Sequence, residues 1–168
     1  MYGNERWMMN TIRDTMTVDV ITVIEDQSLE DIVKTMADKN ISCVVVVKGE
    51  RPIGIITERD LVKRVLYKRE DMAKIKAKDV MTSPVISISP DIQFGDALSV
   101  MESNKLRRLV VVEDDSLAGV VTNTDIVSKT RSINNYNKKL EFYQNIQTYF
   151  IFIFFLFIVV YFVVQFLL

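Results

Sequence analysis

Two seven-residue stretches, GIITERD at Gly54–Asp60 and GVVTNTD at Gly119–Asp125, follow one pattern. Each consists of a glycine, two β-branched apolar residues, a threonine, two variable residues and an aspartate. An apolar run that ends in a threonine, with an aspartate three positions later, is typical of a buried strand leading into a capped helix. The second stretch lies 65 positions after the first. The chain is therefore predicted to contain a repeated unit.

The similarity extends well beyond the two stretches. Shifting the sequence by 65 positions aligns residues 14–62 with residues 79–127 without a gap. DTMTVDVITV then faces DVMTSPVISI, and the three valines at 45–47 face three valines at 110–112. An ungapped match of this length indicates two copies of one unit.

Apolar periodicity changes in the same order within each copy. In the first copy it predicts a strand at 20–24, a helix opened by Ser28, strands at 43–48 and 53–56, and a helix after Asp60. In the second copy it predicts a strand at 85–89, a helix at 93–104, strands at 109–113 and 118–121, and a helix from Asp125. A unit of roughly 55 residues buries too little surface to be comfortably stable alone. The predicted fold class is therefore α/β (α+β), with two β-α-β-β-α repeats packed as a pseudo-symmetric pair.

Composition excludes several classes of function. The 168 residues carry 21 basic and 22 acidic side chains, no histidine and one cysteine. The near-neutral charge gives no reason to expect a nucleic-acid partner. Without histidine, neither a histidine-dependent triad nor a typical zinc site can form, and no phosphate-binding P-loop pattern occurs. We expect no enzyme, no metal and no cofactor, and we interpret Cys43, inside an apolar run, as a core residue.

The two copies resemble a tandem pair of CBS domains, often called a Bateman module. The resemblance is carried by the DxMT opening, at Asp14–Thr17 and Asp79–Thr82, and by the glycine-to-aspartate closing motif. It covers residues 10–70 and 75–131. It implies a regulatory module that senses an adenosyl nucleotide (AMP, ADP, ATP or S-adenosylmethionine) in the cleft between the repeats. It also implies a homodimer that transmits a packing change to a partner.

The resemblance further implies roles for individual residues. Asp60 and Asp125 would bind the ribose, Thr57 and Thr122 the phosphate or ribose, and the motif glycines would let the backbone approach the ligand. Arginines would face the phosphates: Arg59, Arg107 and Arg108. Backbone of the following residues would flank the purine: Ile21, Thr22, Ile41, Ser42 and Cys43 in the first site, and Ile86, Ser87, Leu106 and Arg107 in the second.

An alternative interpretation stays open for the same residues. The threonine and aspartate have capping-box spacing, so they could serve only to cap a helix, at about 1 kcal/mol each. The module would then be a structural dimerisation unit without a nucleotide, and its arginines would be solvated surface residues. The copies also differ, because Thr124 stands where the first motif has Arg59 and Val110 replaces a proline frequent in the family. Unequal sites are therefore expected.

The C-terminal part has a different character. We interpret residues 132–147 as a polar linker and 148–168, with Gln165 as the only strongly polar residue, as a transmembrane helix. Lys138 and Lys139 before it favour a single-pass C-terminal anchor with the CBS pair facing the cytoplasm. A membrane protein would then be a possible partner. The alternatives are a cytoplasmic protein with this helix buried in a dimer or partner, a strand, and an unselected translation product.

Overall fold

A computed structural model describes residues 10–66 and 71–167 of the chain. Contacts divide it into two compact units, Met1–Ile126 and Val127–Leu168. The first unit contains both repeats, and the second contains most of one long helix.

The first repeat forms a three-stranded sheet with helices at three points of the chain. The elements, in order, are η1 (Ile12–Asp14), β1 (Thr22–Ile24), α1 (Leu29–Asp38), β2 (Cys43–Lys48), β3 (Arg51–Thr57), α2 (Glu58–Asp60) and η2 (Leu61–Leu66), a π-helix. The strand order is β1-β2-β3, with β1 parallel and β3 antiparallel to β2. Ser28 caps α1 by accepting a hydrogen bond from the Asp31 backbone N–H. The predicted helix start is thereby confirmed.

The second repeat has the same order of elements. It consists of α3 (Ala77–Val80), β4 (Ser87–Ile88), α4 (Phe94–Ser103), β5 (Arg108–Glu113), β6 (Ser116–Thr122) and the start of α5 (Asn123–Leu167). Its sheet order is β4-β5-β6, with the same pairing directions as the first sheet. The α+β fold with two matching sheets is confirmed. Strands β1 and β4 are shorter than predicted, because parallel pairing with the central strands begins only at Thr22 and Ser87.

Alternate residues of the central strands belong to different cores. In β2, Val44 and Val46 are buried in a cluster with α1, whereas Val45 is buried in a second cluster with Val110 and Val120 of the other repeat. Successive side chains of a strand point to opposite faces of a sheet. One valine run therefore contributes both to the repeat's own core and to the packing of one repeat on the other.

The DxMT segment of each copy pairs with the final strand of the other copy. The backbones of Thr17 and Val120 exchange hydrogen bonds of 2.9 and 3.0 Å, and those of Thr82 and Ile55 exchange bonds of 2.8 and 3.1 Å. We call residues 10–17 and 75–82 the leading segments. Their exchange between the repeats ties the two copies into one unit.

The exchange also explains the motif glycines. A Cβ on Gly54 would lie 2.5 Å from Met81 Sδ, and a Cβ on Gly119 would lie 2.7 Å from the Thr17 carbonyl oxygen. Real Cβ atoms do not approach other atoms this closely. We expected these glycines to let the backbone approach a ligand. In the structure, each glycine instead makes room for the leading segment of the other repeat.

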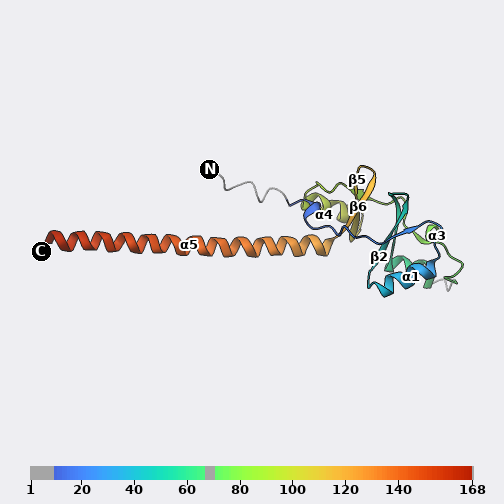
Figure 1. The fold of residues 1–168 in the computed structure, drawn as a ribbon, viewed down its shortest axis with the longest axis horizontal. Coiled ribbons are helices and arrows are strands. Elements are labelled where there is room, and N and C mark those ends of the chain that lie inside the picture. Colours follow the sequence, from blue (N-terminus) through green and yellow to red (C-terminus); the bar gives the residue numbers. More distant parts are fainter. Residues whose placement is uncertain (1–9, 67–70, 168) are drawn as a thin grey trace. The chain divides into compact units, whose positions relative to one another are not determined.

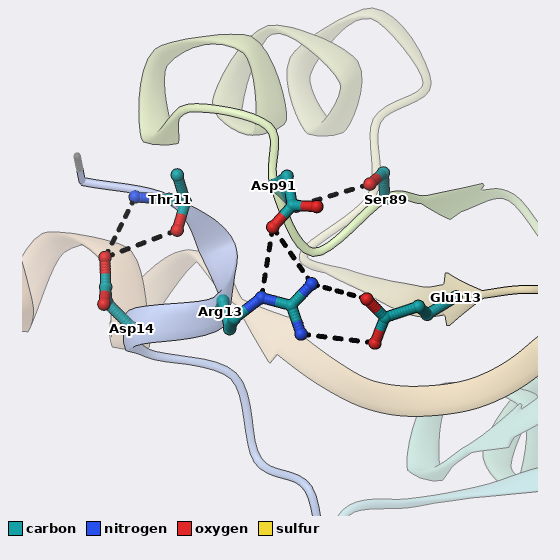
Figure 2. Close-up of polar contacts among 6 residues, drawn as sticks. All are labelled: Thr11, Arg13, Asp14, Ser89, Asp91 and Glu113. Carbon is teal, nitrogen blue, oxygen red and sulfur yellow. Dashed lines mark hydrogen bonds and ion pairs between the residues drawn. The ribbon is translucent and has the colours of Figure 1, made fainter. Parts of the chain in front are cut away.

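Ionic contacts hold each leading segment on the opposite repeat. Arg13 bridges Asp91 and Glu113, with its Nη2 3.0 Å from Asp91 Oδ1 and 2.6 Å from Glu113 Oε1 (Figure 2). At the equivalent place of the other leading segment, Lys78 Nζ lies 2.8 Å from Asp26 Oδ1. The hydrogen bond from Arg13 lowers the pKa of Glu113, and that from Lys78 lowers the pKa of Asp26. Both carboxylates therefore favour the charged state in the folded protein.

The second unit contains α5 from Val127 onward, the long helix coloured orange to red in Figure 1. Residues 132–147, expected to form a polar linker, lie within this helix. The aromatic side chains that are described from Tyr149 to Phe155 are exposed, as in Phe152 at 74%. The side chains of Phe157 and of 159–168 lie outside the described residues. In the part of the chain that is described, no helix is long and apolar enough to cross a membrane. The predicted transmembrane tail, residues 148–168, lies largely among these undescribed side chains, and the membrane anchor stays a prediction.

Candidate functional site

A cavity of about 330 Å³ lies beside the first motif and is lined by both repeats. The first repeat contributes the end of β3 and the start of the following helix, with Ile55 and residues 57–60. The second repeat contributes Thr82, residues 84–86 and residues 105–108. We call this cavity the first cleft. It contains seven of the residues predicted from the sequence: Thr57, Arg59, Asp60, Ile86, Leu106, Arg107 and Arg108.

The first cleft combines residues that the sequence had placed in different sites. Because Thr82 pairs with Ile55, the chain that follows it brings Ile86 to the cleft wall that also holds Asp60. The sequence had grouped Asp60 with Ile21 and its neighbours, and had grouped Ile86 with Asp125. The exchange of leading segments, which local periodicity cannot reveal, accounts for this difference.

Asp60 is held firmly by the helix that it helps to cap. Its Oδ2 accepts hydrogen bonds from the Thr57 backbone N–H at 3.0 Å and from Thr57 Oγ1 at 2.6 Å. In return, Thr57 Oγ1 accepts from the Asp60 N–H at 3.4 Å. These bonds form a capping box, and the Asp60 side chain is only 14% exposed. The capping role is present, and it leaves Asp60 Oδ1 directed elsewhere.

The second oxygen of Asp60 faces the leading segment of the second repeat. Asp60 Oδ1 accepts a hydrogen bond from Thr82 Oγ1 at 3.2 Å and lies 3.7 Å from Arg64 Nε. The same guanidinium donates to the carbonyls of Val80 and Met81 at 2.9 and 2.8 Å. A ligand group that bonds to Asp60 Oδ1 must therefore either share this oxygen with Thr82 of the leading segment or displace the Thr82 hydroxyl from it.

Positive charge exceeds negative charge around the first cleft. Four cations line it, and two carboxylates accompany them: Arg59, Lys105, Arg107 and Arg108 with Glu58 and Asp60. Arg108 is partly buried and fixed, because its Nη1 donates at 3.0 Å to both the carbonyl and the hydroxyl of Ser42. Arginine and lysine at the wall of a cleft are suited to phosphate or carboxylate groups of a ligand.

The second motif repeats the cap but has different neighbours. Asp125 Oδ2 accepts from the Thr122 N–H at 2.9 Å and from Thr122 Oγ1 at 2.7 Å. The backbone carbonyl of Asp125 accepts from Thr15 Oγ1 at 3.3 Å. Among the described residues, no hydrogen bond to Asp125 Oδ1 is present. Asp60 and Asp125 therefore cap their helices in the same way through Oδ2, whereas the surroundings of their Oδ1 atoms differ.

The other predicted site residues lie outside the lining of the first cleft: Ile21, Thr22, Ile41, Ser42, Cys43, Ser87, Thr122 and Asp125. Thr22 and Ser87 line two further hollows, of about 480 and 460 Å³. The hollow lined by Ser87 borders the first cleft, because Pro84 and Val85 line both.

Sequence reasoning missed several residues of the first cleft: Ile55, Glu58, Thr82, Pro84, Val85 and Lys105. Thr82 could have been found, because it belongs to the DxMT motif. Lys105 carries no local signal, since it follows a helix end, where a basic residue usually faces solvent.

Comparisons with known proteins agree with the repeat. The model of the CBS domain family matches residues 12–67 and 77–131. Uncharacterized protein MK0525 of Methanopyrus kandleri is 38% identical over 111 residues, which cover 65% of this chain and 57% of that protein. The inosine-5'-monophosphate dehydrogenase of Methanocaldococcus jannaschii is 38% identical over 115 residues, which cover 67% of this chain and 22% of the enzyme. The chain thus spans little more than half of the first relative and a minor part of the second.

A solved structure shows the same fold. The crystal structure of CBSX2 in complex with AMP matches 74% of this chain and 98% of its own with a TM-score of 0.64, at 22% identity. Both family matches fall on the two repeats described above. The chain belongs to the CBS domain family.

Proposed function

We propose that this chain is a regulatory module that binds an adenosyl nucleotide in the first cleft and transmits binding as a change in the packing of its repeats. One observation carries the proposal. A carboxylate in a helix's first turn, Asp60, lies at the wall of a cleft whose four cations come from both repeats. Nucleotide binding by a member of the same family, CBSX2 with AMP, supports it.

The cleft residues suit the three parts of a nucleotide. The ribose hydroxyls would donate hydrogen bonds to Asp60, the residue with an oxygen that is not needed for the cap. The exposed apolar side chain of Ile86, together with Leu106, would contact the base. Arg59 and Arg107 would bind the phosphate, where their charge is favourable. The same ligand would thus contact both repeats at once.

Binding would alter the contact between the repeats. A ribose that bonds to Asp60 Oδ1 competes with Thr82 and Arg64 for that oxygen. Because Arg64 also holds the carbonyls of Val80 and Met81, the competition would act on the leading segment of the second repeat. A ligand shifts an equilibrium between two packings only through such differential contacts. The proposal includes a homodimer of the module and a protein partner, whose contacts with the module would change when its packing changes.

Calorimetry on the full chain, in a mild detergent because α5 exposes apolar residues, tests the proposal. We expect saturable binding of at least one of AMP, ADP, ATP and S-adenosylmethionine, and loss of binding in Asp60→Ala. The matched control is Asp31→Ala, because Asp31 is a first-turn aspartate in a cap with Ser28 and lies outside the cleft. Absence of heat with all four compounds, or wild-type binding by Asp60→Ala, would refute the proposal.

A structural dimerisation module is the second candidate. It is favoured by the capping boxes, because Asp60 and Asp125 each already have a role without any ligand. Under this candidate, Asp60→Ala lowers the melting temperature as Asp31→Ala does, and no adenosyl compound shifts that temperature in the wild type. The same titration therefore separates the two functions.

A further inference from the structure

We infer that the two motifs differ in the charge of the ligand they accept, so that each chain binds one phosphorylated nucleotide, at the first cleft alone. The inference rests on the proposed function and deepens it. It starts from the pseudo-symmetry of the repeats, which assigns each residue of the first cleft a counterpart 65 positions away.

The backbone confirms that these counterparts are equivalent in structure. The pairing of Thr82 with Ile55 recurs as the pairing of Thr17 with Val120. Lys105 and Asn40 both adopt a left-handed conformation, with φ of 54° and 50°. A residue near the second motif can therefore be compared directly with the residue that lines the first cleft.

All four cations of the first cleft are missing at the second motif. Their counterparts are neutral: Thr124 for Arg59, Asn40 for Lys105, Ser42 for Arg107 and Cys43 for Arg108. The second position also has two carboxylates, but they are not both counterparts of those in the first cleft. Asp125 corresponds to Asp60, Asn123 takes the place of Glu58, and Asp19 takes the place of Pro84. A set with four cations and two carboxylates thus corresponds to a set with two carboxylates and no cation of its own, since the one guanidinium that reaches Ser42 is that of Arg108, whose hydrogen bonds are already made there. A phosphate, which carries one to two negative charges at neutral pH, is attracted by the first and repelled by the second.

The conformation of Lys105 supports a role for its charge. Left-handed backbone is accepted readily by asparagine and less readily by residues with longer side chains. Asn40 therefore suits its position, whereas Lys105 occupies the same conformation at a cost. Unfavoured backbone conformations at a cleft are a recognised sign of function. Here the cost accompanies an ammonium group placed at the cleft wall.

Arg108 adds a second reason for the inequality. Its guanidinium donates to the Ser42 carbonyl, which also accepts from the Glu58 N–H at 3.3 Å. Ser42 is the counterpart of Arg107, whose own carbonyl accepts from Asn123 at 3.0 Å. The carbonyl of Ser42, near the second motif, thus already accepts a hydrogen bond from Arg108, which lines the first cleft. The arrangement favours one phosphate-bearing ligand.

Titration of the full chain with AMP tests the inference, with adenosine as the probe without phosphate. For the wild type we expect one AMP per chain. Asp60→Ala should abolish AMP binding, whereas Asp125→Ala should change the AMP affinity by less than about twofold. Circular dichroism of each variant establishes that it is folded. Two AMP molecules per wild-type chain, or loss of AMP binding in Asp125→Ala, would overturn the inference and leave the proposed function standing.

Exchanging charges between equivalent positions gives the complementary test. The double variant Arg59→Thr with Lys105→Asn changes two exposed residues to their counterparts, and should weaken AMP binding by about tenfold or more while weakening adenosine by less than about threefold. The reciprocal variant, Asn40→Lys with Thr124→Arg, leaves the first cleft intact and controls for a general effect of charge. It should bind AMP at the first cleft with unchanged affinity. Equal weakening of AMP and adenosine by the first pair would contradict the charge argument, and failure of the wild type to bind either compound would instead refute the proposed function.

Discussion

At the scale of single residues, the absence of one side-chain atom allows the two repeats to interlock. Gly54 and Gly119 each lie where a leading segment crosses the final strand of the other repeat. Their closest neighbours differ in kind, because Gly54 faces the side chain of Met81 and Gly119 faces the backbone carbonyl of Thr17. Since a methionine side chain can change rotamer and a paired backbone cannot, equal substitutions should have unequal effects.

Alanine substitutions at the glycines test this difference. We expect Gly119→Ala to lower the free energy of unfolding by about 1–3 kcal/mol or more, and Gly54→Ala to lower it less, because overpacking is relieved only where a neighbour can move. Gly95→Ala is the control: no atom lies within 4 Å of its Cβ position, and alanine favours the helix, so stability should be unchanged or up to about 1 kcal/mol higher. Denaturant unfolding followed by circular dichroism provides the three values. A larger loss at Gly54 than at Gly119 would contradict the explanation.

At the scale of elements, the leading segments are held by matched ionic contacts. Arg13 binds Asp91 and Glu113 of the second repeat (Figure 2). Lys78 binds Asp26 of the first repeat. All these groups are exposed, so each contact contributes little on its own. Their main effect is therefore expected in the dependence of stability on pH.

The pKa of Glu113 is lowered from 4.5 by Arg13, and that of Asp26 is lowered from 3.8 by Lys78. A carboxylate with a lowered pKa stabilises the fold above its unfolded pKa, and that stabilisation is lost as the pH falls through the folded value. Between about pH 5 and pH 3, the wild type should lose more stability than the double variant Glu113→Gln with Asp26→Asn. Glu102→Gln, in an exposed part of α4, is the control and should follow the wild type. Parallel melting curves for the double variant and the wild type across this range would exclude the contribution.

The elements could largely be predicted from the sequence, whereas their exchange could not. Apolar periodicity identified α1 and the valine strands, because burial of one face dictates the spacing of apolar residues. Periodicity does not say which repeat a segment pairs with, and Thr17 and Thr82 have nearly identical local sequences. The lining of the first cleft therefore differs from the predicted grouping of site residues by repeat. Lys105 was missed for a similar reason, because its backbone conformation and its place at the cleft are set by the tertiary fold.

At the scale of the whole first unit, three connections link the repeats. The sheets share a core through Val45, Val110 and Val120, and both leading segments cross to the opposite repeat. The candidate cleft is itself built from both copies. A change that weakens one repeat should therefore weaken the other as well, since the two share a core and each packs on the leading segment of the other.

Truncation of one shared valine tests this cooperativity. Val110→Ala should cost about 2 kcal/mol, from the lost apolar contact and the small cavity left in the shared core. If the repeats open together, amide hydrogen exchange should accelerate by up to about 30-fold in β2 and β5 alike, although only β5 carries the substitution. Val18→Ala is the control, because Val18 is 62% exposed and its truncation should leave exchange nearly unchanged. Faster exchange confined to β5 would mean that the second repeat opens independently, and a ligand contacting both copies could then not act through their shared packing.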